Sequence, residues 1–250
     1  MKLIYMNKKI KALIAIGGTG GHVFPGYNLA KHLRNKNFDV QLVTDKRGLK
    51  YLKEYKNFKI RTLSSSPLIK KNIFMLFTSA FLIFFSIINS IFYLTLNRPH
   101  IIFGMGGYAS LPICIAASIL KIKFVIYENN LIIGKANKFL LRFTYKVLVS
   151  NKELEGIPQK YINKIFEIGN IINQEIINFS NKESKNISNK KISILILGGS
   201  QAAKIFAEVL PNIFKQCVDQ GISIKIFQHC LSNQNKKLQS FYKNHNIDYE

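Results

Sequence analysis

Residues 12–26 read ALIAIGGTGGHVFPG, and this stretch decides the fold of the chain around it. An apolar run too short for a helix meets a cluster of glycines, after which apolar residues recur at the spacing of a helix face: Val23, Leu29, Ala30 and Leu33. The pattern predicts a strand, a tight turn and a helix. Glycines let the backbone adopt positive φ angles and approach a ligand closely, and the free N–H groups at a helix start favour a phosphate. We therefore expect a ligand that carries a diphosphate.

Two other interpretations of this turn stay open. A dinucleotide-binding turn has the pattern G-x-G-x-x-G, and Gly18 and Gly20 fit it, but Val23 stands where the third glycine belongs. Asp45 ends the next predicted strand, where a ribose-binding acid is expected, and this supports the dinucleotide alternative. The last interpretation is a turn that binds nothing, which is disfavoured because clustered glycines cost chain entropy on folding.

The composition fits a globular α/β protein with a basic surface. The chain has 250 residues, 48% of them hydrophobic, which suffices for one large α/β domain and part of a second. The net charge of +23 comes mostly from scattered lysines, without a dense arginine run or a zinc spacing. We therefore expect no nucleic-acid partner and an anionic membrane surface instead. Cys114, Cys217 and Cys230 form no C-x-x-C pair and fit a reducing cytoplasm, and residues 1–11 predict no secretory signal.

The first part of the chain alternates predicted strands and helices. Strands are expected at residues 39–44, 59–63, 100–103 and 123–127, and helices at residues 46–55, 110–120 (with Pro112 in the first turn) and 134–143. This alternation predicts a parallel sheet with helices on both faces and ligands beyond the carboxyl ends of the strands. A second glycine turn at residues 104–108 and an acid-amide cluster at residues 128–130 follow strands at that edge. Together with the first turn they predict a binding site.

Residues 72–97 contain no charged side chain and are crowded with large apolar ones. A stretch of about 20 apolar residues is long enough to cross a bilayer. A crossing would put two strands of one sheet on opposite sides of the membrane, so we favour a helical hairpin or one long helix between sheet and lipid. Lys70, Lys71 and Arg98 flank the segment and suit anionic headgroups. A wholly buried core helix is the remaining alternative. The expected lipid contacts are Phe74, Phe77, Phe81, Phe84 and Phe85.

Four motifs in this sequence resemble those of the MurG family of peptidoglycan N-acetylglucosaminyltransferases. They are GGTGGHVFPG at residues 17–26, GMGGY at 104–108, YENN at 127–130 and GGSQ at 198–201. Their order and spacing agree with that family over most of the chain. The ten-residue first motif is highly specific, whereas the GGSQ turn alone is a weak signal.

The resemblance implies an α/β fold of the GT-B type, with two Rossmann-like, doubly wound domains facing a cleft. Residues 1–165 are expected to form the acceptor- and membrane-binding domain, and residues 166–250 the beginning of a UDP-sugar-binding domain that is incomplete in this chain. The implied reaction transfers N-acetylglucosamine from UDP-N-acetylglucosamine to the C4 hydroxyl of the muramoyl sugar of lipid I, which is linked to undecaprenyl diphosphate. The product is lipid II. The implied location is peripheral, at the cytoplasmic face of the bacterial inner membrane.

The resemblance also assigns roles to individual residues. His22 is the candidate base for the acceptor hydroxyl, Glu128 is its rival, and a hydrogen bond from His22 to a substrate is a third alternative. The implied donor-binding positions are Thr19, Gly20, Gly21, Asn130 and Ser200, and the implied acceptor-binding positions are Gly106, Gly107 and Tyr108. The sequence has no D-x-D pair, and backbone N–H groups can hold a diphosphate without a metal, so we expect neither a metal nor a cofactor.

Two departures from the family pattern bear on function. Asn173 stands where the family usually carries an arginine that reaches the donor phosphate, and a neutral amide cannot make a charge-assisted bond. From residue 191 onward too few residues remain for a second domain of about 100 residues, so we expect a fragment of a longer protein or a naturally short one. Two other functions therefore compete with the transferase: a non-catalytic lipid-binding relative and, less favoured, a nicotinamide-dependent dehydrogenase.

Overall fold

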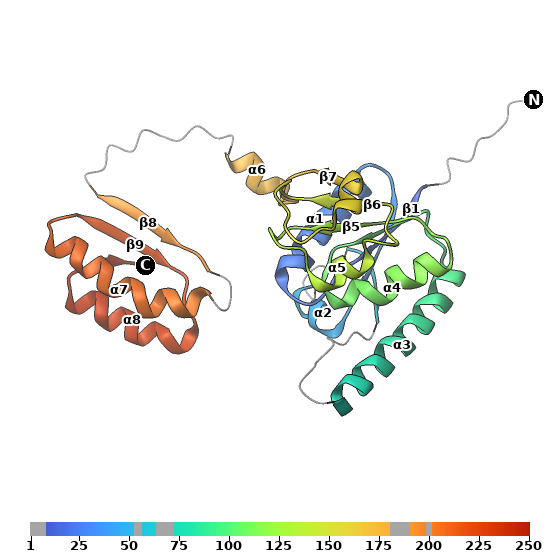
Figure 1. Ribbon diagram of the computed structural model, residues 1–250. Helices are drawn as coiled ribbons and strands as arrows, with labels where there is room; N and C mark the ends of the chain where they lie inside the picture. The colour runs from blue at the N-terminus through green and yellow to red at the C-terminus, as the bar shows by residue number, and fades with distance from the viewer. Residues whose placement is uncertain (1–8, 53–56, 64–72, 181–190, 199–201) are drawn as a thin grey trace, which may run out of the picture. The chain divides into compact units, whose positions relative to one another are not determined.

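The computed structural model describes residues 9–52, 57–63, 73–180, 191–198 and 202–250, and Figure 1 shows its elements. The chain divides into two compact units, Met1–Lys182 and Glu183–Glu250, and each unit has its own parallel sheet. The α/β class predicted from the alternating pattern is confirmed.

Seven parallel strands build the sheet of the first unit, in the order β3-β2-β1-β4-β5-β6-β7. The strand order reverses between β1 and β4, so the sheet is doubly wound, with its topological switch point at those two strands. The strands are β1 (Lys11–Ala15), β2 (Asp39–Thr44), β3 (Lys59–Thr62), β4 (Ile101–Gly104), β5 (Phe124–Glu128), β6 (Lys146–Val149) and β7 (Ile165–Glu167).

The register of the central strands brings the two glycine turns to one edge. Ala15 of β1 lies opposite Gly104 of β4 on one side and opposite Val43 of β2 on the other. Just beyond the strand pairing, Met105 N donates to the Ala15 carbonyl at 2.9 Å. Because the three strands run parallel, the residues that follow them emerge side by side at the carboxyl edge, as the sequence predicted.

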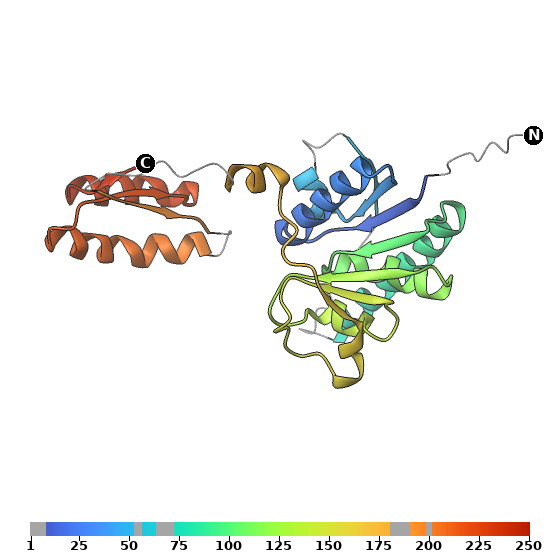
Figure 2. The same cartoon turned by 90° about the horizontal axis from the view of Figure 1, so that it is seen from above.

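Helices cover both faces of this sheet (Figures 1 and 2). One face carries α1 (Gly20–Asn35) and α2 (Lys46–Leu52), and the other carries α3 (Ile73–Leu96), α4 (Gly107–Ile119) and α5 (Lys135–Leu140). The strands are apolar on both sides for this reason. In β1, Ala12 and Ile14 pack in the core under α1, whereas Leu13 and Ala15 pack in the core under α3 and α4, because successive side chains of a strand point to opposite faces.

Several boundaries differ from the sequence expectation. Helix α4 begins at Gly107, earlier than predicted, because the glycine turn leads directly into the helix, and Pro112 therefore lies inside α4 rather than in its first turn. Helix α5 ends at Leu140, whose carbonyl accepts bonds from two following N–H groups in a tight turn. The second domain was expected to begin at residue 166, but Ile165–Glu167 forms β7 beside β6, and the first unit continues to Lys182. The end of the helix expected at residues 46–55 lies outside the described residues.

The uncharged segment forms one long helix, α3, so the hairpin alternative is wrong. Near its end, Tyr93 and Leu94 pack into the core beneath the sheet. Its other side is open, since Phe77 is 71% and Phe92 is 65% exposed, and the wholly buried alternative is therefore also wrong. By length and composition Phe77–Leu96 is apolar enough to cross a membrane, but the strands that precede and follow α3 belong to the same sheet.

The second unit repeats the strand-helix alternation on a smaller scale. Its strands are β8 (Ile192–Ile196), β9 (Ile224–Gln228) and β10 (Asp248–Tyr249), and its helices are α7 (Ala202–Asp219) and α8 (Ser232–Asn244). Both helices lie on one face of this sheet, as Figure 1 shows, and Phe214 and Tyr242 pack there against Ile226. Ile196 faces the same core, so the neighbouring Leu195, which is 66% exposed, faces the other side. Among the described residues of this unit, helices therefore cover only one face of the sheet.

Candidate functional site

The candidate site lies where β1, β2, β4 and β5 end, at one edge of the first sheet. The loops after β1, β4 and β5 hold residues 16–19, 105–106 and 129–134, and Asp45 follows β2. These strands are neighbours in the sheet, so the loops lie close together although they are far apart in the sequence. The edge is also the topological switch point, where open α/β sheets bind their ligands.

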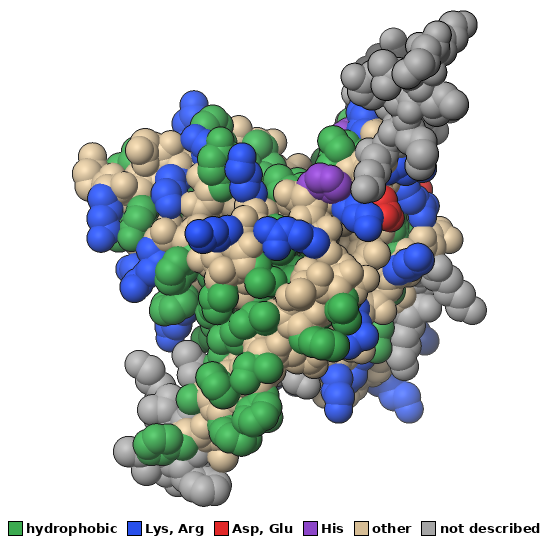
Figure 3. All heavy atoms as spheres, turned by 90° about the vertical axis from the view of Figure 1, so that its right-hand side faces the viewer, with side chains coloured by type: hydrophobic (Ala, Val, Ile, Leu, Met, Phe, Trp, Pro, Cys, Tyr) green, Lys and Arg blue, Asp and Glu red, His purple; other side chains and the backbone are tan. Residues whose placement is uncertain are grey.

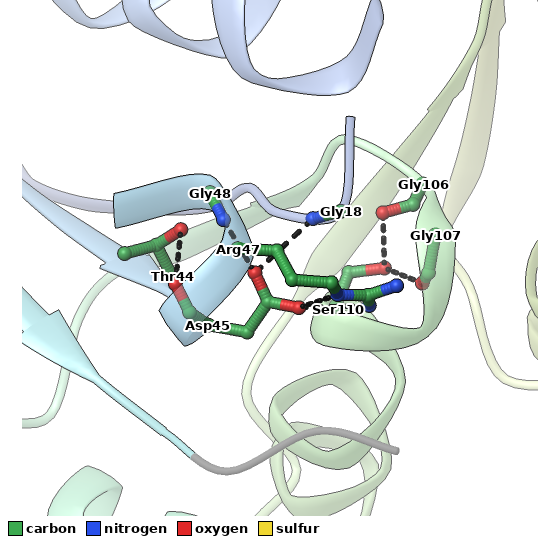
Figure 4. Close-up of polar contacts among 8 residues, drawn as sticks. All are labelled: Gly18, Thr44, Asp45, Arg47, Gly48, Gly106, Gly107 and Ser110. Carbon is green, nitrogen blue, oxygen red and sulfur yellow. Dashed lines mark hydrogen bonds and ion pairs between the residues drawn. The ribbon is translucent and has the colours of Figure 1, made fainter. Parts of the chain in front are cut away.

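Asp45 joins the first glycine turn to α2, as Figure 4 shows. Its Oδ1 accepts hydrogen bonds from Gly18 N at 3.2 Å and Gly48 N at 2.8 Å, and its Oδ2 accepts one from Arg47 Nε at 2.9 Å. The Asp45 side chain is 4% exposed, whereas that of Arg47 is 49% exposed. Gly18 reaches the carboxylate with a φ of 82°, which glycine adopts without strain. Because the protein engages both oxygens of Asp45, this residue does not offer the free carboxylate that a ribose-binding site needs.

The second glycine turn closes against His22 of α1. Gly106 and Gly107 have φ angles of 90° and 71°, which side-chain-bearing residues rarely adopt. A Cβ on Gly106 would lie 3.0 Å from His22 Nδ1, and one on Gly107 would lie 3.3 Å from His22 Cδ2. The imidazole therefore occupies the space that side chains at these positions would fill. Ser110 holds the turn from within α4, since its hydroxyl donates to the Gly106 and Gly107 carbonyls at 3.2 and 3.0 Å.

Burial affects both the hydrogen bonding and the protonation state of His22. Its Nδ1 is buried and has no hydrogen-bond partner within the described part of the chain. Burial lowers the pKa of His22 below its usual 6.5, and the negative charge of Glu128 and the backbone of Met105 oppose this shift. An imidazole with a lowered pKa is neutral near pH 7, which is the state that a general base requires.

Glu128 at the end of β5 is a second buried carboxylate, 1% exposed. Its Oε1 accepts bonds from Asn130 N and Nδ2 at 3.2 and 2.7 Å, and its Oε2 accepts bonds from Gly134 N at 2.9 Å and Asn137 Nδ2 at 3.0 Å. These bonds wrap residues 129–134 around the carboxylate and attach them to α5. Sequence reasoning missed Asn137, because a single polar residue inside a helical pattern gives no signal of its own.

The start of α1 collects three of the predicted donor-binding positions. Thr19 is the N-cap residue, and its side chain makes no capping hydrogen bond. Gly20 and Gly21 form the first turn of the helix. Asn129 Nδ2 donates to the Gly21 carbonyl at 3.2 Å, so the loop after β5 is tied directly to this turn. The first and third motifs are therefore in contact.

The other predicted positions are distributed differently. Tyr108 lies half-buried in the first turn of α4, and the side-chain amide of Asn130 is turned toward Glu128. Asn173 Oδ1 accepts a bond from Glu175 N at 3.2 Å at the start of α6 (Gln174–Ser180), so this side chain serves the helix end. Ser200 lies outside the described residues. Within the part of the chain that the structure describes, no three His, Cys, Asp or Glu side chains are grouped to hold a metal ion.

The predicted lipid contacts form one exposed aromatic face of α3. Phe77, Phe81, Phe84 and Phe85 are 71%, 62%, 58% and 52% exposed. Figure 3 shows hydrophobic side chains gathered along this part of the surface, with Lys and Arg side chains elsewhere on the same view. The side chain of Phe74 and the predicted flanking Lys70 and Lys71 lie outside the described residues. Arg98 is described, and its Nη2 donates to the Leu120 carbonyl at 2.9 Å.

The doubly wound sheet with glycine turns at its switch point belongs to a fold class, the α/β proteins of the GT-B type. Several solved structures share this fold. One is MurG of Acinetobacter baumannii, with a TM-score of 0.72 and 23% identity over 96% of this chain and 64% of that one. Another is UDP-GlcNAc 2-epimerase of Neisseria meningitidis bound to UDP-GlcNAc, with a TM-score of 0.60 and 17% identity over 96% of this chain and 72% of that one. At these identities the likeness shows the fold alone.

Sequence similarity identifies the family. Residues 12–149 match the Glycosyltransferase family 28 N-terminal domain. The chain is 37% identical over 245 residues to the UDP-N-acetylglucosamine--N-acetylmuramyl-(pentapeptide) pyrophosphoryl-undecaprenol N-acetylglucosamine transferase of Pelagibacter ubique, covering 98% of this chain and 66% of that protein. It is 30% identical over 249 residues to the protein of the same name in Rickettsia felis, covering 96% and 67%. The chain belongs to glycosyltransferase family 28, and the resemblance to MurG proteins is confirmed. It spans about two thirds of the length of these relatives.

Proposed function

We propose that this protein takes part in the transfer of N-acetylglucosamine from UDP-N-acetylglucosamine to lipid I, and that its first unit binds the acceptor and supplies the base. The substrates come from the names of its relatives, and the product is lipid II, a precursor of peptidoglycan. The observation that carries the proposal is the position of His22. A neutral imidazole with a buried, unpartnered nitrogen lies against two glycines at the switch point of the sheet.

In the proposed step, His22 accepts the proton of the C4 hydroxyl while that oxygen attacks the anomeric carbon of the donor sugar. The bond from this carbon to the diphosphate oxygen breaks, UDP leaves with the electron pair, and the configuration at the anomeric carbon is inverted. General-base assistance of this kind contributes about 10²–10⁴-fold to a rate. Such a contribution is large enough to be measured by replacing the base.

The helix starts at this edge suit the diphosphates of both substrates. Neither α1 nor α4 has a side-chain cap or an acidic residue in its first turn, and an uncapped helix start of this kind favours an anion. This supports the assignment of Gly106, Gly107 and Tyr108 to the acceptor. It also supports the assignment of the residues at the start of α1, Thr19, Gly20 and Gly21, to the donor.

We assign Glu128 to positioning rather than to proton transfer. Its two oxygens already accept four hydrogen bonds from the loop after β5 and from α5. The same loop reaches the first turn of α1 through Asn129. Glu128 therefore fixes the loop that borders His22 and, by its charge, influences the proton affinity of the imidazole. The donor-contacting roles of Asn130 and Ser200, and of the second unit as a whole, belong to this proposal.

We also propose that the exposed aromatic face of α3 binds the bilayer in which the acceptor lies. Four phenylalanines on one helix are more than half exposed, a large apolar area for a protein surface in water. Embedding them in the interface would hold the protein at the cytoplasmic face of the inner membrane, where a polyprenyl diphosphate presents its headgroup. The basic chain, with a net charge of +23, suits anionic lipids.

A transfer assay tests this function directly. The protein is incubated with radiolabelled UDP-N-acetylglucosamine and lipid I in vesicles that contain phosphatidylglycerol, and labelled lipid II is extracted. Product formation that requires both substrates supports the proposal. Vesicle binding without any product would instead favour the second candidate, a lipid-binding relative, which the exposed face of α3 alone would explain. The dehydrogenase alternative is not supported, because the oxygens of Asp45 are engaged.

A further inference from the structure

Arg47 is a cation at this edge to which neither the motifs nor the proposed function gives a role. It is the second residue of α2, which begins just after Asp45. Figure 4 shows its guanidinium beside the carboxylate of Asp45. An added Cβ on Gly17 would overlap the Ala109 side chain and lie 3.0 Å from Asp45 Oδ1. The carboxylate that holds Arg47 is therefore packed where the first glycine turn meets the first turns of α4.

The guanidinium is held in place yet open to solvent. Its Nε and Nη2 contact Asp45 Oδ2 at 2.9 and 2.8 Å, and Asp45 is itself fixed by the N–H groups of Gly18 and Gly48. Nη1 makes no hydrogen bond to any described residue, and the side chain is 49% exposed. An arginine fixed on one side by a carboxylate keeps N–H donors on its other side, and it loses little conformational entropy when it binds an anion.

The surroundings of Arg47 favour a phosphate over other anions. The starts of α1 and α4 offer uncapped N–H groups at the same edge, and their first turns hold no acidic residue. A guanidinium donates two parallel hydrogen bonds to two oxygens of one phosphate, a geometry that a lysine cannot supply. Backbone donors on one side and a fixed guanidinium on the other match a group with several charged oxygens.

We infer that Arg47 binds a phosphate oxygen of a diphosphate-bearing substrate at this edge. The choice of ligand rests on the proposed function, but the contact itself is a property of this chain. Two sources share this chemistry, the prenyl diphosphate of the acceptor and the nucleoside diphosphate of the donor. Arg47 is then a substrate-binding residue, and Asp45 acts through it as a positioning residue.

Calorimetric binding with two soluble probes tests the inference. Farnesyl diphosphate stands for the prenyl diphosphate and UDP stands for the donor, and each is titrated into the wild-type protein, Arg47→Gln and Arg47→Lys. We expect Arg47→Gln to weaken the binding of one probe about ten- to hundredfold, because charge-assisted hydrogen bonds are lost. Arg47→Lys should recover part of the loss, and the loss should shrink as salt rises. The probe that is affected identifies the source of the phosphate.

Arg34→Gln is the matched control. Its Nη1 donates to the Asn57 carbonyl, and it lies at the far end of α1, so the same charge is removed away from the glycine turns. This variant should bind both probes like the wild type. Equal binding of Arg47→Gln and wild type, or no binding of either probe to the wild type, would overturn the inference. A purely structural role of Arg47 would also overturn it, and would appear as a lowered Tm with equal losses for both probes. The transfer assay is read separately, so failure of the proposed function is distinguished from failure of this contact.

Discussion

Two buried carboxylates organise the candidate site, Asp45 after β2 and Glu128 after β5, and they differ in what balances their charge. Asp45 accepts bonds from two glycine N–H groups and pairs with the guanidinium of Arg47. Within the described part of the chain, the bonds that Glu128 accepts come from neutral backbone and amide groups, and its charge acts on the titratable imidazole of His22 by raising the pKa. A buried carboxylate thus fixes a loop on each side of the site. Asp45 holds the permanent cation of Arg47, and Glu128 influences the pKa of the titratable His22.

The largest expected effect is a loss of stability when Glu128 is replaced, because Glu128 is the buried carboxylate that does not pair with an arginine. Glu128→Ala leaves the donors of the loop after β5 without their acceptor, and each lost bond to a buried group costs about 1 kcal/mol or more, so we expect about 3 kcal/mol of destabilisation. Urea unfolding followed by circular dichroism measures it. A change below about 1 kcal/mol would show that water replaces the carboxylate easily and that this half of the comparison is wrong.

The second-largest effect is a lower rate of transfer when His22, the proposed base, is replaced. His22→Ala should lower kcat by about two orders of magnitude or more, because the acceptor hydroxyl loses its proton acceptor. Initial rates of lipid II formation at saturating substrates measure the change. The unfolding free energy serves as the control and should change little. A loss below tenfold with unchanged donor binding would move the role of base to another residue.

Removing Asp45, the carboxylate that pairs with Arg47, should lower the free energy of unfolding less than removing Glu128 does. Asp45→Ala removes the acceptor of Gly18 N and Gly48 N, but the half-exposed Arg47 remains solvated, so we expect about 2 kcal/mol of destabilisation. The same urea titration compares the two variants directly. If Asp45→Ala destabilises the protein more than Glu128→Ala does, the ion pair with Arg47 contributes more than the neutral network around Glu128.

The smallest effect is a shift in the pH profile of activity, and it tests most directly whether Asp45 and Glu128 have different roles. Burial lowers the folded-state pKa of His22 below 6.5, so activity should fall on the acid side as the pH drops through that lowered value and the base becomes protonated. Glu128 raises this pKa, so Glu128→Gln should move the acid limb of kcat/KM to still lower pH. Asp45→Asn should leave the limb in place. Equal shifts for both variants would contradict the proposed division of roles.

The sequence predicted much of the fold because its signals are local. Residues 39–44 form β2 as expected, since alternating and apolar runs are typical of strands wherever they occur. The glycine turns and the helices after them were placed within a few residues. The hairpin alternative for residues 72–97 failed because the choice between one helix and two depends on how the segment packs on α4.

The candidate site was predicted only where a motif marks it. His22, Glu128 and the glycines lie together at one edge, as the parallel order of the strands required. Asn137 and Arg47 gave no such signal, because an amide or an arginine in a helix is usually a solvated surface residue. Their importance comes from contacts with Glu128 and Asp45 that exist only in the folded chain.

The sequence alone therefore determined the order of strands and helices, the glycine turns and the family, because each depends on periodicity or on a run of consecutive residues. The tertiary structure decided which groups share the site. The bond from Gly18 to Asp45 spans 27 residues and the bond from Asn129 to Gly21 spans 108, distances over which no local pattern operates. The partners of each buried carboxylate, and hence the different roles of Asp45 and Glu128, follow from how the sheet brings its carboxyl ends together.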